Sequence, residues 1–289
     1  YGIIDQDNVK RRKFYEVQSF FKEMKENEAL TQSEVKSDVA VVYDYESMAS
    51  FRIQRQSFLM DYKQEVYRLY RPFYKKNINM DVIPSDSDFD KYKVLLLPVM
   101  IVHKKEVQDK VRKFVSGGGT VVFTYRTAVK DYYNNLTLGQ FNPTYYTDLV
   151  GGYVEEVESF QDDQVAFLIG NEEFEGINGT ATVFRDMLKT TTAKTLFKYE
   201  DEFFEDLAAV TLNEYEGGKV YYIGSGADNT IMDAITNKII NESNLDAIES
   251  EEGVEVVRRS LNNEDYYFVM NYTSDEKKFK NEILKAYES

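Results

Sequence analysis

The chain has 289 residues, of which 43% are hydrophobic, enough to build two modest domains rather than one. Its net charge of −15 repels phosphate backbones and anionic lipid, so neither nucleic acid nor a membrane surface is expected as a partner. The sequence contains no cysteine, which excludes disulfides, thiolate metal sites and cysteine nucleophiles. Together with the lack of a basic-then-apolar signal segment, this favours a cytoplasmic protein.

The N-terminal segment opens with "YGIIDQDN" and then takes on the pattern of a helix up to about residue 30. Its apolar side chains recur at spacings of three and four, at Phe14, Val17, Phe21 and Met24. Charged residues fill the positions between them. We expect an amphipathic helix that needs another body to lie on.

Residues 37–125 alternate between apolar runs and amphipathic stretches. The predicted strands are "SDVAVVYDY" (37–45), "INMDVIP" (78–84), "KVLLLP" (93–98) and "GTVVFTY" (119–125), and the predicted helices span 55–76 and 104–115. Strands that are apolar throughout are typical of sheets covered on both faces. The alternation therefore predicts an α/β domain with a parallel sheet and helices on both sides.

Residues 128–216 are less regular and predict an insertion of mixed structure with several short strands. The parallel pattern returns with a strand at 219–223, a glycine loop at 224–226 and a helix at 228–240. From about residue 247, two β-rich runs flank the turn-prone "NNED". This pattern predicts a β-hairpin, which is not stable by itself.

Two glycine motifs raise the question of nucleotide binding. In "VSGGGTVVF", the glycines Gly117, Gly118 and Gly119 follow a helix and precede a strand, whereas a phosphate loop runs from strand to helix. The triplet therefore indicates the end of a helix. "IGSGADNT" has the order of a phosphate loop, but it lacks the third glycine and a Lys-Ser/Thr ending. Asp228 in this motif is better explained as a helix N-cap.

No other motif identifies a reaction. "PSDSDFD" has alternating aspartates, but Lys91 stands where a calcium loop requires glycine, so a solvated acidic turn is expected. His103 is the single histidine, which excludes a multi-histidine metal site. The spacing of the acidic residues singles out no carboxylate pair for hydrolysis. We therefore expect no catalytic residue, no cofactor and no metal in this chain.

Several stretches, taken in order, resemble one enzyme family. "VAVVYDYESMAS", "YRLYRPFYKKNINMDVIPSDSDFDKYKVLLLPVM", "VRKFVSGGGTVVFTYRTAVKD" and "GVEVVRRSLNNEDYYFVMNYT" are similar to the region after the catalytic barrel in family 42 glycoside hydrolases, the bacterial β-galactosidases. "YGIID" and the helix after it resemble the end of that barrel.

The resemblance implies a domain layout. Residues 1–34 would be an exit helix from a (β/α)8 barrel that is missing here, and 35–246 an α/β trimerisation domain that contains the insertion at 128–216. This domain would be a three-layer, flavodoxin-like or glutamine-amidotransferase-like fold with a parallel sheet. Residues 247–289 would begin a β-sandwich, as a short hairpin or a partial domain.

The implied function is that of a non-catalytic trimerisation region of a β-galactosidase that hydrolyses terminal β-D-galactosides. Both catalytic glutamates of the family lie in the barrel, so neither is carried over to a position in this chain. The fragment is expected to be inactive alone and to form a homotrimer, and galactoside would bind only to the full-length parent.

Candidate interface residues follow from strand ends, because contacts in open α/β sheets gather at the carboxyl edge. They are Tyr43, Asp44, Tyr45, Ser47, Tyr125 and Arg126. Two alternatives remain. One is a stand-alone amidotransferase-like or flavodoxin-like binding module, for which the nucleophilic cysteine and the phosphate loop are missing. The other is a carbohydrate-binding accessory domain, suggested by 23 Tyr and 19 Phe.

Overall fold

A computed structural model describes residues 2–201, 203–204 and 206–287. The chain divides into two compact units, one formed by residues 37–249 and the other by residues 1–36 together with 250–289. Each unit has its own elements and is described separately. Across the described ranges, no helix combines the length and the apolar character needed to cross a bilayer.

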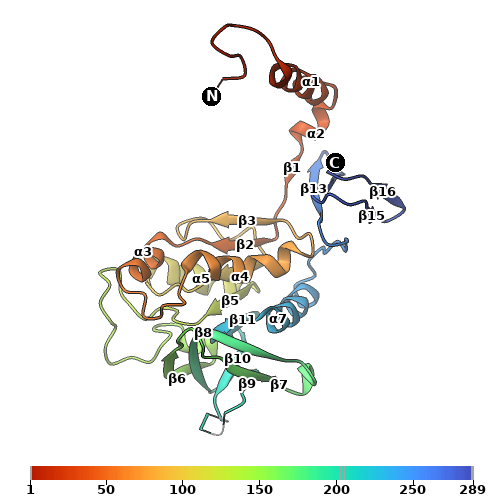
Figure 1. The fold of residues 1–289 in the computed structure, drawn as a ribbon. Coiled ribbons are helices and arrows are strands. Elements are labelled where there is room, and N and C mark those ends of the chain that lie inside the picture. Colours follow the sequence, from red (N-terminus) through yellow and green to blue (C-terminus); the bar gives the residue numbers. More distant parts are fainter. Residues whose placement is uncertain (1, 202, 205, 288–289) are drawn as a thin grey trace. The chain divides into compact units, whose positions relative to one another are not determined.

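The larger unit is built on a mixed sheet of eleven strands (Figure 1). Five of them are parallel, in the order β3-β2-β4-β5-β11. Their bounds are β2 (Val39–Val42), β3 (Met80–Ile83), β4 (Val94–Leu97), β5 (Thr120–Thr124) and β11 (Gly218–Ile223). Every residue of β2, β4 and β5 is buried, as the continuous apolar runs predict.

Helices cover both faces of this parallel part, which confirms the expected α/β architecture. They are α3 (Tyr45–Ile53), α4 (Tyr62–Tyr74), α5 (Lys105–Ser116), α6 (Thr147–Val150) and α7 (Asn229–Glu242). Alternate side chains of β2 point to opposite faces: Val39 and Val41 pack in the core with α4 and α7, whereas Ala40 and Val42 pack with α5 and α6. The unit therefore has three layers, with two cores separated by the sheet.

The region predicted as a mixed insertion extends the same sheet with antiparallel strands. They are β6 (Gly152–Ser159), β7 (Ala166–Gly170), β8 (Asn178–Thr190), β9 (Lys194–Tyr199) and β10 (Ala208–Tyr215), with the short helix η1 (Glu172–Phe174) after β7. The strands β8-β7-β9-β10 continue the order onto β11, and β6 pairs with β8. The insertion thus shares the hydrogen-bonded framework of the parallel strands.

Helix boundaries follow from capping side chains. Asp61 accepts a hydrogen bond from the backbone N–H of Lys63 at 2.9 Å, so α4 begins at Tyr62, and the predicted start at residue 55 is wrong. Helix α3 (Tyr45–Ile53) was not predicted: it lies between the predicted strand at 37–45 and the predicted helix at 55–76, and Asp44 caps it through the N–H of Ser47. After α5 the chain turns at Gly118, whose φ of +94° confirms the glycine triplet as a helix stop.

The second glycine motif differs from its prediction. The predicted glycine loop at 224–226 overlaps the short strand β12 (Ser225–Ala227), which pairs with β8. Asp228 caps α7 by accepting a hydrogen bond from the N–H of Ile231 at 3.1 Å, as predicted. A strand stands where a phosphate would need open backbone, which removes the remaining argument for a nucleotide loop.

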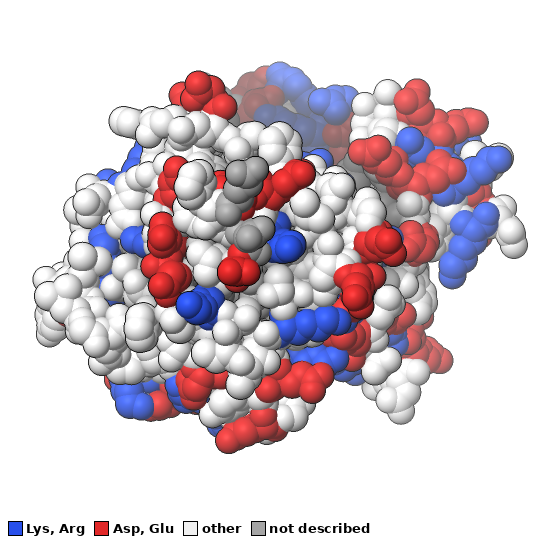
Figure 2. All heavy atoms as spheres, turned by 90° about the horizontal axis from the view of Figure 1, so that it is seen from below, with Lys and Arg blue, Asp and Glu red and all other residues white. Residues whose placement is uncertain are grey.

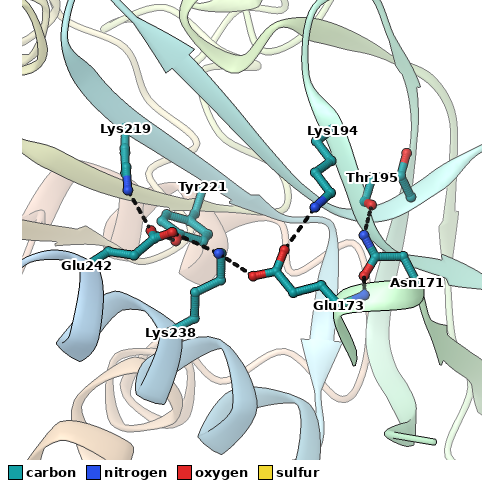
Figure 3. Close-up of polar contacts among 8 residues, drawn as sticks. All are labelled: Asn171, Glu173, Lys194, Thr195, Lys219, Tyr221, Lys238 and Glu242. Carbon is teal, nitrogen blue, oxygen red and sulfur yellow. Dashed lines mark hydrogen bonds and ion pairs between the residues drawn. The ribbon is translucent and has the colours of Figure 1, made fainter. Parts of the chain in front are cut away.

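A chain of ion pairs joins the antiparallel strands to α7 near the amino end of β11 (Figure 3). Glu242 accepts from Lys219 at 3.0 Å and from Lys238 at 2.7 Å. Lys238 also contacts Glu173 of η1, which in turn pairs with Lys194 of β9 at 2.9 Å. This ion-pair network links η1, β9, β11 and α7 with alternating charges.

The smaller unit contains the predicted hairpin. Its elements are α1 (Arg12–Glu26), α2 (Glu28–Gln32), β1 (Glu34–Val35), β13 (Val254–Leu261), β14 (Glu264–Asn271), β15 (Lys277–Phe279) and β16 (Glu282–Leu284). Asn262 and Asn263 have φ of +52° and +65°, as in the two-residue turns that match strand twist. Helix α1 forms as expected, and none of its residues is buried.

Candidate interaction surface

Asp44 lies at the carboxyl end of β2 and is almost fully buried. Its carboxylate accepts hydrogen bonds from the N–H of Ser47 at 2.9 Å and the hydroxyl of Ser85 at 2.8 Å, and Lys104 lies 3.3 Å away. Burial by itself raises the pKa of Asp44, but the hydrogen bonds from Ser47 and the charge of Lys104 lower it overall. The ionised carboxylate therefore fixes the start of α3.

Two other predicted residues are also buried. The hydroxyl of Ser47 accepts a hydrogen bond from the backbone N–H of Val102 at 3.1 Å, which ties α3 to the segment after β4. Tyr125 is fully buried, with its ring 5.5 Å from that of Phe184. Asp44, Ser47 and Tyr125 therefore have no surface to offer a partner, and they act by positioning the backbone around them.

The remaining three predicted residues reach the surface. Tyr45 is exposed and lies edge-on to half-buried Tyr43, with ring centroids 5.2 Å apart. Arg126 is half-buried and has a φ of +58°. Its guanidinium donates to the side-chain oxygen of Gln56 at 2.8 Å and lies over the ring of Phe184.

A buried carboxyl that the sequence did not reveal supports Arg126. One oxygen of Asp186, in β8, accepts hydrogen bonds from the backbone N–H of Arg126 at 2.7 Å and from the hydroxyl of Tyr222 at 2.8 Å. Its other oxygen has no hydrogen-bond partner within the described part of the chain. Burial raises the pKa of Asp186. This contact holds Arg126, the second residue after β5, in its left-handed conformation.

The most prominent feature of this edge is a set of exposed apolar side chains, of which sequence analysis singled out Tyr45 alone. They come from α3, the loop before α4 and the segment after β5, and their exposed fractions lie between 57% and 84%. We call them the aromatic rim, and its members are Tyr45, Ile53, Phe58, Tyr132, Tyr133, Leu136, Leu138 and Phe141. Figure 1 draws α3 and the long segment after β5 on the same side of the sheet.

Polar contacts beneath the rim hold two of its three segments together, α3 and the segment after β5. The hydroxyl of Ser50, in α3, donates to the side-chain oxygen of Asn134 at 2.6 Å. Lys130 is buried, and its ammonium donates to the same oxygen at 3.1 Å and to the hydroxyl of Ser50 at 3.3 Å. Burial lowers the pKa of Lys130, and among the residues that the structure describes it forms no ion pair. Hydrogen bonds thus fix the rim from below, and the buried ammonium of Lys130 takes part in them.

His103 anchors the same loop. Its Nε2 lies 3.0 Å from the hydroxyl of Thr137 and its Nδ1 lies 3.1 Å from the amide of Gln108. Its ring packs edge-on against Tyr145 at 5.1 Å. Burial lowers the pKa of His103. Both ring nitrogens are engaged in holding the loop, and beside it lies an open hollow of about 830 Å³ lined in part by Tyr132 and Tyr133.

Charge is distributed unevenly around this edge. In Figure 2 the surface on the side where Figure 1 places α3 is mostly uncharged, with a few basic groups, although the protein carries a net charge of −15. Arg52 and Arg55 are exposed here, and neither has an ion-pair partner in the described ranges. An exposed apolar surface with unpaired cations is typical of a site that binds another macromolecule.

Comparisons with known proteins place the chain. The family model described as the β-galactosidase trimerisation domain matches residues 37–246, and the one described as the β-galactosidase C-terminal domain matches residues 253–287. Among similar proteins, β-galactosidase BgaA of Clostridium cellulovorans is 30% identical over 251 residues, which cover 85% of this chain and 37% of the relative. β-Galactosidase GalA of Bacillus licheniformis is 30% identical over 282 residues, covering 94% and 41%.

Solved structures agree in fold. The β-galactosidase from Bacillus circulans sp. alkalophilus superposes with a TM-score of 0.91 at 24% identity, over 99% of this chain and 46% of that one. Gan42B, a GH42 β-galactosidase, superposes with a TM-score of 0.88 at 25% identity, over 99% and 44%. The chain thus spans less than half the length of these relatives, and the described residues contain no (β/α)8 barrel. By the match that covers most of its length, the chain belongs to the family of β-galactosidase trimerisation domains.

Proposed function

We propose that this chain assembles as a homotrimer and that the aromatic rim is the surface through which it does so. One observation carries the proposal: large apolar side chains from three segments stay exposed, while Ser50, Asn134 and Lys130 hold two of these segments, α3 and the one after β5, together. Exposed apolar surface of this extent is retained where a partner covers it. The match to a trimerisation domain supports the stoichiometry.

Of the residues predicted from strand ends, we propose that Tyr43, Tyr45 and Arg126 contact the partner. Tyr45 belongs to the rim, and Tyr43 supports its ring. Arg126 presents a planar donor fork at the surface, with Gln56 and Phe184 fixing its direction. Asp44, Ser47 and Tyr125 hold this arrangement from below.

The whole protein would be a cytoplasmic β-galactosidase that hydrolyses terminal β-D-galactosides. The names of the relatives support this activity, and the chain covers 37–41% of the two relatives compared above. Catalysis would lie in a part of those enzymes that this chain does not match, so no residue here is assigned a catalytic role. Galactoside would be a ligand of the whole enzyme.

We further propose that the parallel part is flavodoxin-like, close to class I glutamine amidotransferases. Numbered along the chain, its parallel strands have the order 2-1-3-4-5, which supports this label. The absence of cysteine excludes the amidotransferase thiol, and β12 occupies the glycine motif, so a stand-alone binding module is not favoured. Residues 1–34, 35–246 and 247–289 would be the domains of the parent, and the family matches at 37–246 and 253–287 support these boundaries.

Light scattering across a dilution series tests the proposal. We expect the mass of three chains at micromolar concentration, with no hydrolysis of a chromogenic galactoside by the same sample. A monomer at every concentration would contradict the proposed assembly. Hydrolysis that follows the protein through purification would contradict the non-catalytic role.

A further inference from the structure

We propose that each rim docks on an acidic edge of the next copy. We define the acidic edge as Glu155, Glu156, Asp162 and Asp163 with the exposed apolar residues Val157, Val165 and Phe167. The inference rests on the proposed homotrimer and names the two faces that would meet in it. Its occupant is a second copy of this chain.

Symmetry requires two different faces. A closed ring of three identical chains is held by heterologous contacts, in which one patch of each copy meets another patch of the next copy. The rim alone therefore cannot make a threefold ring by contacting itself. A complementary patch must be present on the same chain.

The side chains of the rim determine which residues the complementary patch needs. Arg52 and Arg55 project from the rim region without a carboxylate partner among the described residues, and Lys130 lies buried below them without one. A surface that covers the rim must therefore supply carboxylates for the arginines. It must also supply apolar side chains for Phe58 and its neighbours.

The acidic edge meets both requirements. Strand β6 pairs only with β8 in the sheet as described, so it is an edge strand. Glu155 and Glu156 on β6, and Asp162 and Asp163 after it, are exposed and have no ion pair in the described ranges. By contrast, Glu158 on the same strand is already paired with Arg185. The three apolar members are each about half exposed.

The two patches border each other within one chain. The hydroxyl of Ser57, next to Phe58 of the rim, donates to the carbonyl of Phe160 at 3.2 Å. The ring of Phe141, also in the rim, lies 4.3 Å from that of Tyr153 at the start of β6. Patches on opposite sides of a subunit build filaments, whereas neighbouring patches can close a small ring. Their adjacency therefore favours a trimer around an axis near this corner.

A charge exchange tests the pairing in the 289-residue chain. We compare the chain with R52E/R55E, with E155R/E156R and with the variant that combines all four changes, by sedimentation equilibrium at low salt. Each double variant is expected to raise the trimer dissociation constant by about tenfold or more, since like charges then face each other. The combined variant is expected to return to within about threefold of the unmodified chain, because the signs match again.

Matched controls carry the same charge changes elsewhere. R71E/K75E alters two exposed cations of and just beyond α4, and E172K/E175K two exposed acids of and just beyond η1, and neither is expected to change the trimer. Circular dichroism checks that each variant is folded. If R52E/R55E weakens the trimer but E155R/E156R does not, or if the combined variant fails to recover, the acidic edge is not the partner, while the proposed trimer stands. A monomeric unmodified chain would overturn both proposals.

Discussion

Two groups of charged side chains in the larger unit differ: those near the amino end of β11 pair with one another, whereas those around the aromatic rim do not within the described residues. Near the amino end of β11, Lys219, Glu242, Lys238, Glu173 and Lys194 alternate in sign and satisfy one another within the chain (Figure 3). Around the aromatic rim, at the carboxyl side of the sheet, exposed arginines have no carboxylate in the described ranges. Charges that are paired internally serve the fold, whereas unpaired cations beside exposed apolar side chains are available to a partner. This difference separates residues expected to affect stability from those expected to affect assembly.

The largest effect on stability is expected at the cap beneath the rim. Replacing Asp44 by Ala removes the acceptor for Ser47 and Ser85 and leaves Lys104 with Glu46 alone. We expect a loss of about 3 kcal/mol in the free energy of unfolding, measured by urea denaturation. Glu46→Ala is the control and should cost less than about 1 kcal/mol, because this carboxylate is partly exposed. Equal losses would contradict the role of Asp44.

The two buried carboxyls should respond oppositely to pH. The pKa of Asp44 is lowered, so its contribution is present at neutral pH and is lost as the pH falls through its folded-state pKa, below 3.8. Burial raises the pKa of Asp186, so its contribution grows as the pH falls through that raised pKa toward 3.8. In Asp186→Asn, the amide oxygen can still accept from Arg126 and Tyr222 without a charge. In the unmodified chain, Asp186 should raise the free energy of unfolding as the pH falls from 8 to 5, and we expect the variant to lack this gain in denaturant unfolding. The same change between pH 8 and pH 5 in both proteins would contradict the assignment.

The ion-pair network provides the next effect. Lys238→Met removes the cation that joins Glu173 to Glu242 and leaves two partly buried carboxylates facing each other. We expect the free energy of unfolding to fall by about 2 kcal/mol. The trimer dissociation constant, measured under conditions where the variant is folded, should not change. A change in assembly without a loss of stability would contradict the separation between the two ends of the unit.

A rim substitution should do the reverse. Tyr133→Ser is expected to weaken association by about 1–2 kcal/mol per contact, because a large aromatic group is no longer buried against the partner. The free energy of unfolding of the monomer should stay within about 0.5 kcal/mol, because the side chain is exposed. Tyr67→Ser is a matched control, since Tyr67 in α4 is 59% exposed but lies outside both the rim and the acidic edge. Equal weakening by both would show that the rim has no special role.

The smallest effect is expected at the helix stop. Gly118→Ala places a side chain at a φ of +94°, where the added carbon makes only an ordinary contact of 3.9 Å with the carbonyl oxygen of Gly217 but the backbone conformation is unfavourable. We expect a loss of about 1 kcal/mol in thermal or urea unfolding. Assembly should be unaffected. Gly139→Ala, in the loop of the rim and also at positive φ, offers a comparison in which folding and assembly can both respond.

The framework of the larger unit could be predicted because its signals are local. Apolar runs placed β2, β4 and β5, the glycine triplet ended α5, and Asp228 began α7. Helix α3 was missed because its apolar residues do not form a clear stripe at helical spacing. Only the Asp44 cap marks its start. β12 was missed because its pairing with β8 is decided by residues far apart in sequence.

The rim could not be predicted for a different reason. Tyrosine and leucine also occur in the core, so residue type alone does not show that Tyr132, Tyr133 and Leu138 are exposed. Only tertiary packing decides that these side chains stay outside. The support from Asp186 was equally hidden, since it contacts Arg126 across sixty positions of sequence. The order of the motifs along the sequence was enough to identify the family. The aromatic rim could be recognised only from the three-dimensional structure.

Hydrogen exchange of the backbone at two protein concentrations tests the central claim most directly. At a concentration where the trimer forms, we expect slower exchange in α3 and in residues 131–141 than in a dilute monomeric sample, with α7 unchanged. Exchange at the rim that is the same in trimer and monomer would contradict the account, because the surface buried on assembly would then lie elsewhere.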